Sequence, residues 1–177
     1  MKTFFLSLLA VFTFVFAKAQ KFKNVEHNQF KINFLSPGLE YEKGIGENTS
    51  LLVGANLQFY TRPVPFEEVW GFMPAAFGEF RYYTNFNRRI VKNKEIAGNS
   101  GNYIGFRNNT YFVKSSLYDS VDIEGGVFGH LGPLYGLQRT YLRGFNFNVQ
   151  LGFGYYYDAK YDGMFAPIGG LSIGWVF

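Results

Sequence analysis

Two long segments near the end of the chain alternate between apolar residues and polar or small ones. The first has Phe145, Phe147, Val149, Leu151, Phe153, Tyr155 and Tyr157 at its apolar positions, with Asn146, Asn148, Gln150, Gly152, Gly154 and Tyr156 between them. The second sets Phe165, Leu171, Ile173, Trp175 and Phe177 against Ala166, Gly170, Ser172, Gly174 and Val176. A period of two residues predicts β-strands with one apolar face and one polar or small face.

Shorter segments with the same period precede these two. We expect strands near residues 30–34, 39–42, 51–59, 75–86, 103–113 and 127–141, divided by polar or glycine-rich stretches. No stretch of the chain has a convincing helical period. The pattern predicts an all-β chain with eight strands if Ser36-Pro37-Gly38 is a connection, and with seven if it is a bulge inside one long strand.

The N-terminus has the organisation of a secretory signal peptide. Met1-Lys2 is basic, residues 4–16 are rich in apolar side chains, and Ala17-Lys18-Ala19 is a small-x-small cleavage site. The apolar run is shorter than the roughly 20 residues of a membrane-spanning helix. We therefore expect residues 1–19 to be cleaved, residues 20–27 to form a short N-terminal segment, and residues 28–177 to form the folded domain.

The composition favours a surface that faces lipid. Aromatic residues make up 21% of the chain, charged residues only 17%, and cysteine is absent. Soluble domains usually carry about 25% charged residues. A lipid-facing surface with aromatic residues at both interfaces accounts for the shift. Without disulfides, a small exported chain needs a large core, a closed sheet or a lipid surround for its stability.

The net charge adds little to this picture. The formal charge is +4, and Lys2 and Lys18 leave with the signal, which lowers it to +2. No basic cluster with interleaved aromatic residues indicates nucleic-acid binding, so we expect no nucleic-acid partner.

Long alternating strands behind an export signal predict a barrel in the outer membrane, with lipid outside and polar groups inside. We expect an eight-stranded antiparallel up-and-down transmembrane β-barrel, because an even strand number returns both termini to the periplasmic side. The last strand must pair with the first, since an open backbone edge is costly in lipid. Residues 62–73, 115–126 and 158–164 are then external loops, and residues 87–102 face the periplasm.

One part of the chain carries a recognisable pattern. It consists of Glu79-Phe80-Arg81-Tyr82-Tyr83-Thr84-Asn85-Phe86-Asn87-Arg88-Arg89, followed by Asn99-Ser100-Gly101-Asn102-Tyr103, and of Leu39-Glu40-Tyr41-Glu42 before Thr49-Ser50-Leu51. This pattern resembles uncharacterised small outer-membrane barrels of Gram-negative bacteria, which are related in fold to outer membrane protein A-like transmembrane domains. The resemblance covers most of residues 28–177. It implies an eight-stranded barrel and brings no established activity.

The last residues add a second resemblance. Gly174-Trp175-Val176-Phe177 is similar to the assembly signal of such barrels, an amphipathic strand that ends in an aromatic residue. Trp175 and Phe177 are the positions that match, whereas Ser172 stands where the signal usually has glycine. The resemblance implies insertion by the outer-membrane assembly machinery, with outer-membrane lipid and lipopolysaccharide around the protein.

Charged residues on the polar strand faces are the main candidates for a site. They are Lys31, Glu40, Glu42, Glu79, Arg81 and Arg107. The interior of an eight-stranded barrel is only wide enough for side chains, and unpaired charges inside it would be costly. We expect these three acids and three bases to form an ion-pair network that plugs the lumen. A narrow gated pore, in which the pairs exchange partners, is the alternative.

Catalytic and metal-binding patterns are weak. A lipid A-modifying barrel enzyme would need a histidine with a serine and a carboxylate, and only His27 and His130 are available. Ser115, Ser116 or Ser120 could approach His130 in space. Asp119, Asp122 and Glu124 share one segment but match no calcium loop. Gly152, Gly154, Gly169 and Gly170 precede no helix, which argues against a phosphate-binding loop. We expect no enzyme, cofactor or metal.

The sequence thus predicts a structural, adhesive or accessory protein of the outer membrane. Its external loops, with Glu67, Glu68 and Trp70 in one of them, are candidates for protein contacts outside the cell, and residues 87–102 for periplasmic contacts. The rival is a soluble periplasmic lipocalin-like barrel that binds an apolar ligand. That rival needs Phe145, Leu151 and Phe153 to point inward and Asn146 and Gln150 to face water.

Overall fold

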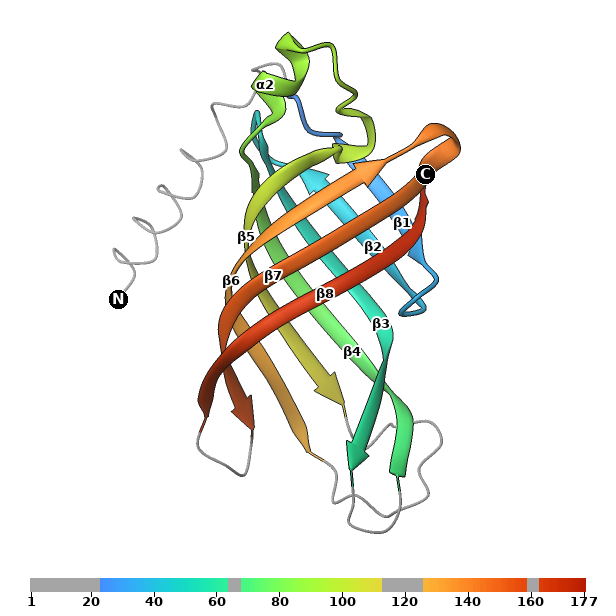
Figure 1. The fold of residues 1–177 in the computed structure, drawn as a ribbon, viewed down its shortest axis with the longest axis vertical. Helices are drawn as coiled ribbons and strands as arrows, with labels where there is room; N and C mark the ends of the chain where they lie inside the picture. Colours follow the sequence, from blue (N-terminus) through green and yellow to red (C-terminus); the bar gives the residue numbers. More distant parts are fainter. Residues whose placement is uncertain (1–22, 64–67, 113–125, 159–162) are drawn as a thin grey trace, which may run out of the picture.

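The described residues of the computed structural model, 23–63, 68–112, 126–158 and 163–177, form one closed antiparallel sheet. Its strands are β1 (Asn28–Asn33), β2 (Gly38–Gly44), β3 (Thr49–Pro63), β4 (Glu68–Tyr83), β5 (Gly101–Phe112), β6 (Val127–Thr140), β7 (Phe145–Asp158) and β8 (Met164–Val176). Each strand pairs with its neighbours in sequence, and β8 pairs with β1 (Figure 1). The predictions of an all-β chain and of eight strands are confirmed, with Ser36-Pro37 in the connection between β1 and β2.

Side chains alternate between the two faces of this sheet, as the period of two predicts. Along β7 the apolar positions lie on the outer face and the amide side chains on the inner face. The exposed positions include Phe145, Leu151, Phe153 and Tyr155, and the buried ones Asn146, Asn148 and Gln150. The polar face of the sheet is therefore its inside.

The hairpin of β3 and β4 is longer than the sequence indicated. Residues 62–73 were expected to form a loop, but β3 continues to Pro63 and β4 begins at Glu68, with Thr61 opposite Trp70. The expectation was wrong because Pro63 was treated as a strand breaker. A proline is tolerated on a strand that has a free edge, and β2 pairs with β3 only as far as Asn56.

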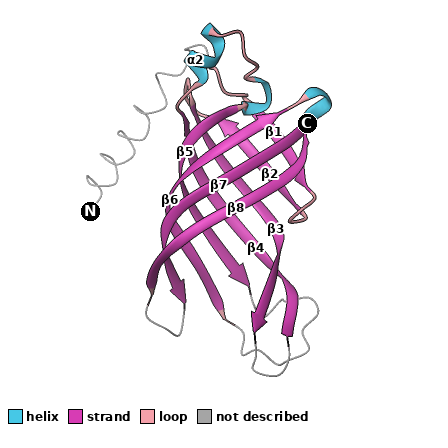
Figure 2. Ribbon diagram, viewed as in Figure 1, coloured by secondary structure: helices cyan, strands magenta, loops and turns pink. Residues whose placement is uncertain are grey.

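One end of the ring is covered by short helices, visible in cyan in Figure 2. The connection between β4 and β5 contains α2 (Phe86–Val91) and the 3-10 turn η1 (Ala97–Asn99), and η3 (Leu142–Gly144) joins β6 to β7. Phe86 is fully buried and stacks on Tyr83 at 4.5 Å between ring centroids. Val25 is buried in the same apolar cluster. Part of the expected periplasmic segment, residues 87–102, is thus folded across the end of the ring.

The wall of the ring is uneven in height, and Figure 1 shows the β1–β2 hairpin ending partway down its neighbours. The last pair of β2 with β3 is Gly38 with Asn56, and the last pair of β1 with β8 is Asn33 with Gly174. Two backbone hydrogen bonds extend these ladders by one residue, from Leu57 N to Pro37 O and from Phe34 N to Ile173 O. Beyond them, the facing edges of β3 and β8 have no strand between them in the described part of the chain.

Several expectations fall outside the described residues. They are the signal peptide at residues 1–19, most of the segment 115–126, and most of the connection between β7 and β8. In the described ranges, no helix has the length and apolar character that crossing a membrane requires.

Candidate functional site

All six charged residues singled out from the sequence point to the inside of the ring. Lys31 comes from β1, Glu40 and Glu42 from β2, Glu79 and Arg81 from β4, and Arg107 from β5. The first five are buried, and the Arg107 side chain is 12% exposed. Residues two apart on one strand share a face, which is why Glu40 with Glu42, and Glu79 with Arg81, enter the interior together.

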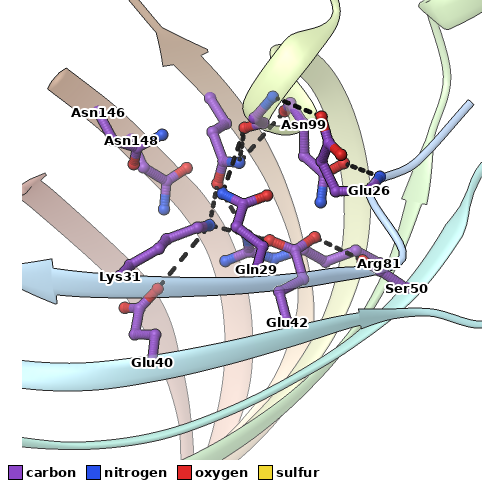
Figure 3. A network of polar contacts seen from close by, with 12 residues as sticks. Glu26, Gln29, Lys31, Glu40, Glu42, Ser50, Arg81, Asn99, Asn146 and Asn148 are labelled. Atoms are coloured by element: carbon purple, nitrogen blue, oxygen red, sulfur yellow. Dashed lines mark hydrogen bonds and ion pairs between the residues drawn. The ribbon is translucent and has the colours of Figure 1, made fainter. Parts of the chain in front are cut away.

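Glu42 is the centre of the network (Figure 3). One carboxylate oxygen lies 2.9 Å from Lys31 Nζ and 3.5 Å from Arg81 Nη1. The other accepts hydrogen bonds from Ser50 Oγ at 2.6 Å and from Tyr83 OH at 2.7 Å. Each oxygen of this fully buried carboxylate therefore has two donors or cations, the compensation that a buried charge requires.

Glu79 continues the network across the interior. Its Oε1 accepts from Arg81 Nε at 2.8 Å, and its Oε2 accepts from Arg107 Nη1 at 3.0 Å. Gln150 Nε2 donates to the same Oε2 at 3.1 Å. Both guanidinium groups also lie over aromatic rings, Arg81 over Tyr103 at 4.4 Å and Arg107 over Phe77 at 3.9 Å. These contacts hold two planar cations inside the ring.

The charges alternate in sign along this path. Lys31, Glu42, Arg81, Glu79 and Arg107 follow one another, each within 3.5 Å of the next. Glu40 lies at the margin of the path, because its nearest cation, Lys31 Nζ, is 4.0 Å away and Asn33 Nδ2 supplies a hydrogen bond at 2.7 Å. Three cations and three carboxylates leave the six-residue network neutral, so a mobile ion of either sign finds no net charge there.

Uncharged residues that sequence reasoning left out of the network complete it. Gln138 Oε1 accepts from Lys31 Nζ at 2.8 Å and from Arg81 Nη1 at 2.9 Å. Its Nε2 donates to the backbone oxygens of Gly98 at 3.1 Å and Asn99 at 3.2 Å. The amide thereby ties the ion pairs to η1 at the covered end of the ring. Its position on the inner face of β6 is the sequence signal that could have found it.

A glycine explains how a large ring fits beside these charges. A Cβ on Gly136 would overlap the ring of Tyr103, which lies across the β5–β6 ladder from it. Tyr103 needs this space to reach the interior, where its OH donates to Asn148 Oδ1 at 2.9 Å and accepts from Gln150 Nε2 at 2.7 Å. Glycine on the inner face thus makes room for a bulky neighbour.

The other half of the interior is less filled. A cavity of about 100 Å³ lies beyond the ion pairs, with Arg107, Asn109 and His130 in its wall. Asn109 Oδ1 and His130 Nδ1 are buried and have no hydrogen-bond partner, and neither has Asn56 Oδ1, which lines the same cavity. Gln29 Oε1 and Asn99 Nδ2, at the covered end, also lack a partner, but the charged groups there are all paired. The interior therefore divides into a network of paired charges and a polar cavity.

The structure bears only partly on the catalytic and metal candidates. His130 lies between the rings of Tyr111 and Tyr156, at 5.8 and 5.1 Å between centroids. Ser115, Ser116 and Ser120 are outside the described residues, as are Asp119, Asp122 and Glu124. His27 precedes β1 and is exposed. Where the chain is described, no three histidine, cysteine or acidic side chains are grouped to hold a metal ion.

The two residues of the expected assembly signal lie at the seam of the ring. Trp175 is opposite Ile32 of β1 and Phe145 of β7. Phe177 N donates to Phe30 O at 2.9 Å and Phe177 O accepts from Phe30 N at 3.3 Å. These contacts help to close the sheet, and the role of the residues in assembly stays a prediction.

A scan against protein-family models found no match to this chain, and comparisons with curated proteins and with solved structures found none either.

Proposed function

We propose that this chain is an integral outer-membrane β-barrel with a structural, adhesive or accessory role, and that ion pairs seal its interior. The observation that carries the proposal is the distribution of polarity, which is the reverse of that in a water-soluble domain. The charged network lies inside the ring, and the apolar side chains lie outside it.

The numbers make the reversal plain. Among the described residues, 16 polar or charged residues are buried against 10 hydrophobic ones, while 27 large hydrophobic residues are exposed. Monomeric soluble proteins rarely expose continuous apolar patches of more than a few hundred Å². A belt of this kind around a closed sheet is what the hydrocarbon core of a bilayer covers.

The directions in which the side chains of β7 point also argue against the soluble lipocalin-like alternative. That alternative needs Phe145, Leu151 and Phe153 inside, where they would form an apolar ligand cavity. These side chains are 38%, 68% and 52% exposed, and the interior beside them holds Asn146, Asn148 and Gln150 instead. An apolar ligand would meet amides and ion pairs there, at a cost in desolvation.

The sealed lumen is favoured over a gated pore because every member of the network between Lys31 and Arg107 already has an oppositely charged partner. Gln138 also links these charges to η1 across the end of the ring. Opening a path for water through the lumen would require several of these buried ion pairs to break together. Removing one partner of a buried ion pair costs about 3–5 kcal/mol.

Membrane extraction tests the location. We expect the protein to stay in the outer-membrane fraction after carbonate or urea washing and to migrate differently in unboiled and boiled gel samples. A soluble periplasmic protein treated in parallel provides the control for washing. Recovery of this chain in the supernatant, with identical migration before and after boiling, would contradict the proposal.

Planar-bilayer recording tests the seal. Purified protein whose insertion has been checked by its unboiled migration should produce no single-channel events. Regular current steps from the same preparation would replace the sealed lumen with the gated pore. Lipid, lipopolysaccharide and the assembly machinery are the partners that this proposal includes, with protein contacts through the external loops.

A further inference from the structure

The cavity beyond the ion pairs reaches the uneven part of the wall. Its lining includes Asn56 and Gln58 from β3, Ser36 from the β1–β2 connection, and Gly170 and Ser172 from β8. They lie at or beyond the last pairs that β1 forms with β8 and β2 with β3, where no described strand lies between β3 and β8. Figure 1 shows the short β1–β2 hairpin ending above this part of the wall. The cavity therefore extends from Arg107 on the far wall to the side of the ring.

Buried polar atoms in this cavity lack partners. Asn109 is 3% exposed and His130 8% exposed, yet Asn109 Oδ1 and His130 Nδ1 form no hydrogen bond. Asn56 Oδ1 is likewise buried without a hydrogen-bond partner. Leaving a buried polar group unpaired costs about 1–3 kcal/mol. Two of the three atoms are amide oxygens, which accept hydrogen bonds, and the imidazole nitrogen donates or accepts according to its tautomer. A group rich in hydroxyls satisfies all three.

The charges of the cavity favour an uncharged group. Arg107 is paired with Glu79 at 3.0 Å, and Glu40 lies 4.0 Å from Lys31 Nζ. Both belong to the six-residue network, whose three cations and three carboxylates leave no net charge for a ligand ion to neutralise. The volume of about 100 Å³ exceeds by several-fold the ~15 Å³ that holds one water on the same measure. Several hydroxyls of one sugar ring or polyol fit this description.

The rim of the side opening is apolar on each border. Phe59 on β3, Leu35 in the β1–β2 connection and Leu171 on β8 are 56%, 54% and 47% exposed. If the ring lies in a bilayer, as proposed above, hydrocarbon surrounds these side chains. Beyond Asn56 the described part of β3 pairs as a strand only with β4, and before Gly174 β8 pairs as a strand only with β7. Polar groups are costly to leave unpaired in lipid. A hydroxylated head group at the opening supplies hydrogen-bond partners there.

We propose that this cavity binds the hydroxylated head group of an amphiphile, such as a sugar-bearing lipid, which enters between β3 and β8 while its tail stays outside on the apolar rim. The inference rests on the proposed membrane location. It adds to that function a binding site, the chemical class of the ligand and the route by which the ligand enters.

Two glycines on opposite faces of the sheet provide a matched test. Gly170 of β8 lines the cavity, and an added Cβ there would meet only the flexible end of Gln150, at 3.3 Å from Oε1. Gly78 of β4 is on the outer face, between the buried Phe77 and Glu79, and an added Cβ there would meet nothing within 4 Å. Gly170→Phe therefore places a ring in the mouth of the cavity, and Gly78→Phe places the same ring outside.

The probe is octyl glucoside, which joins one sugar to one alkyl chain. Protein purified in tetraethylene glycol monooctyl ether, which has the same chain without the sugar, is titrated and observed by native mass spectrometry. We expect one octyl glucoside per wild-type chain, binding at least tenfold weaker to Gly170→Phe, and unchanged binding to Gly78→Phe. Equal binding by the two variants, or no stoichiometric binding to the wild type, would overturn the proposal.

A second pair of variants tests the polar contacts. Asn109→Leu removes the unpaired amide oxygen and should weaken binding about tenfold, the effect of one hydrogen bond of ~1.4 kcal/mol. Asn108→Leu changes an exposed neighbour on the other face and should leave binding unchanged. Equal binding by these two variants would remove the assigned polar contacts and, with them, the proposed site.

Free glucose distinguishes the source of the ligand. We expect no glucose adduct at concentrations that saturate octyl glucoside, because the tail supplies part of the affinity. Glucose binding as tight as that of octyl glucoside would assign the cavity to a soluble sugar and overturn entry from the membrane. Each variant is first checked for its heat-dependent gel migration and for carbonate resistance. If the protein is folded and resists carbonate extraction but fails the binding test, the binding site is refuted and the proposed membrane location is not.

Discussion

The two halves of the interior differ in how their polar groups are arranged. At the end covered by α2 and η1, Glu42 has two partners on each carboxylate oxygen, and Gln138 uses both ends of its amide. Gln29 Oε1 and Asn99 Nδ2 are buried without a partner at this end, but each lies outside the ion pairs. In the other half, the buried atoms without partners are on Asn56, Asn109 and His130, and all three residues line one cavity. Similar side-chain chemistry is therefore used in one half to fill the ring and in the other to line a cavity.

The height of the wall explains the difference. All eight strands surround the ion pairs, because β1 contributes Lys31 and β2 contributes Glu42 at that level. β1 and β2 then end, so they line the cavity only through Asn33 and Glu40, and most of the cavity wall comes from the longer strands. The inward-pointing side chains of two strands are therefore missing from most of that level. Polar groups on the remaining strands have fewer hydrogen-bond partners within reach. Strand length, set by the connection at residues 34–37, thus divides one interior into two parts.

The largest expected effect on stability comes from removing the carboxylate at the centre of the network. Glu42→Leu leaves Lys31 without its 2.9 Å partner and leaves Ser50 and Tyr83 without their acceptor. Deleting one partner of a buried ion pair costs about 3–5 kcal/mol, and we expect a loss of this size in the free energy of unfolding. Reversible urea unfolding in lipid or detergent, followed by gel migration, measures it.

Glu40→Gln is the matched control on the same strand. Glu40 is 4.0 Å from its nearest cation and keeps an amide oxygen for Asn33 after the substitution, so we expect a loss of only about 1 kcal/mol. Similar losses from both variants would mean that the charge of the interior, and not the network around Glu42, determines stability.

Much of the arrangement behind these contrasts could be predicted from the sequence, because strand facing follows from alternation alone. Once Phe80 and Tyr82 are assigned to the outer face, Glu79 and Arg81 must point inward, and the structure places them so. The even count was expected from the topology of a closed barrel, because Ser36-Pro37-Gly38 was compatible with a connection or a bulge, and the structure has a connection there. The direction of each side chain depends on near neighbours in the chain.

Features that depend on distant neighbours could not be predicted. Pro63 is compatible with a long β3 only because β2 ends early beside it. Gln138 joins the network because β6 lies across the interior from β1, which the sequence of either strand does not reveal. The cavity arises from the unequal heights of strands that are far apart in the chain.

The next largest effect should come from charging the outer face, since both halves share it. Leu151 is 68% exposed near the middle of β7. Leu151→Arg places a charge at mid-depth and should cost about 2–4 kcal/mol if lipid surrounds the ring. Tyr141→Arg, at the end of β6, should cost only ~0–1 kcal/mol because such penalties fall toward the interface. Unfolding from lipid vesicles measures the free-energy cost of both substitutions. Small and equal costs would indicate that water, and not lipid, surrounds the outer face of the ring.

A single hydroxyl should have an intermediate effect. Tyr83→Phe removes the 2.7 Å donor to Glu42 at the covered end and should cost about 1.5–3 kcal/mol, the range for a hydrogen bond to a charged group. The neighbouring Tyr82 points outward and is 50% exposed, so Tyr82→Phe should change the unfolding free energy much less. If the two substitutions have the same effect, Tyr83 OH contributes nothing specific to the network.

The smallest effect is expected in the cavity, where it isolates the contrast between the halves. Asn109→Leu loses the hydrogen bond from Nδ2 to Tyr111 OH at 2.8 Å, but it also removes an oxygen that is buried without a partner. These two contributions have opposite signs and similar size, so the free energy of unfolding should change by less than about 1 kcal/mol.

Gln138→Leu is the comparison in the sealed half, because it deletes an amide that serves two cations and two backbone oxygens. Measured together without added amphiphile, the second substitution should cost several times more than the first. Equal costs would mean that the polar groups lining the cavity contribute as much to folding as those of the network, which would leave the cavity no distinct role.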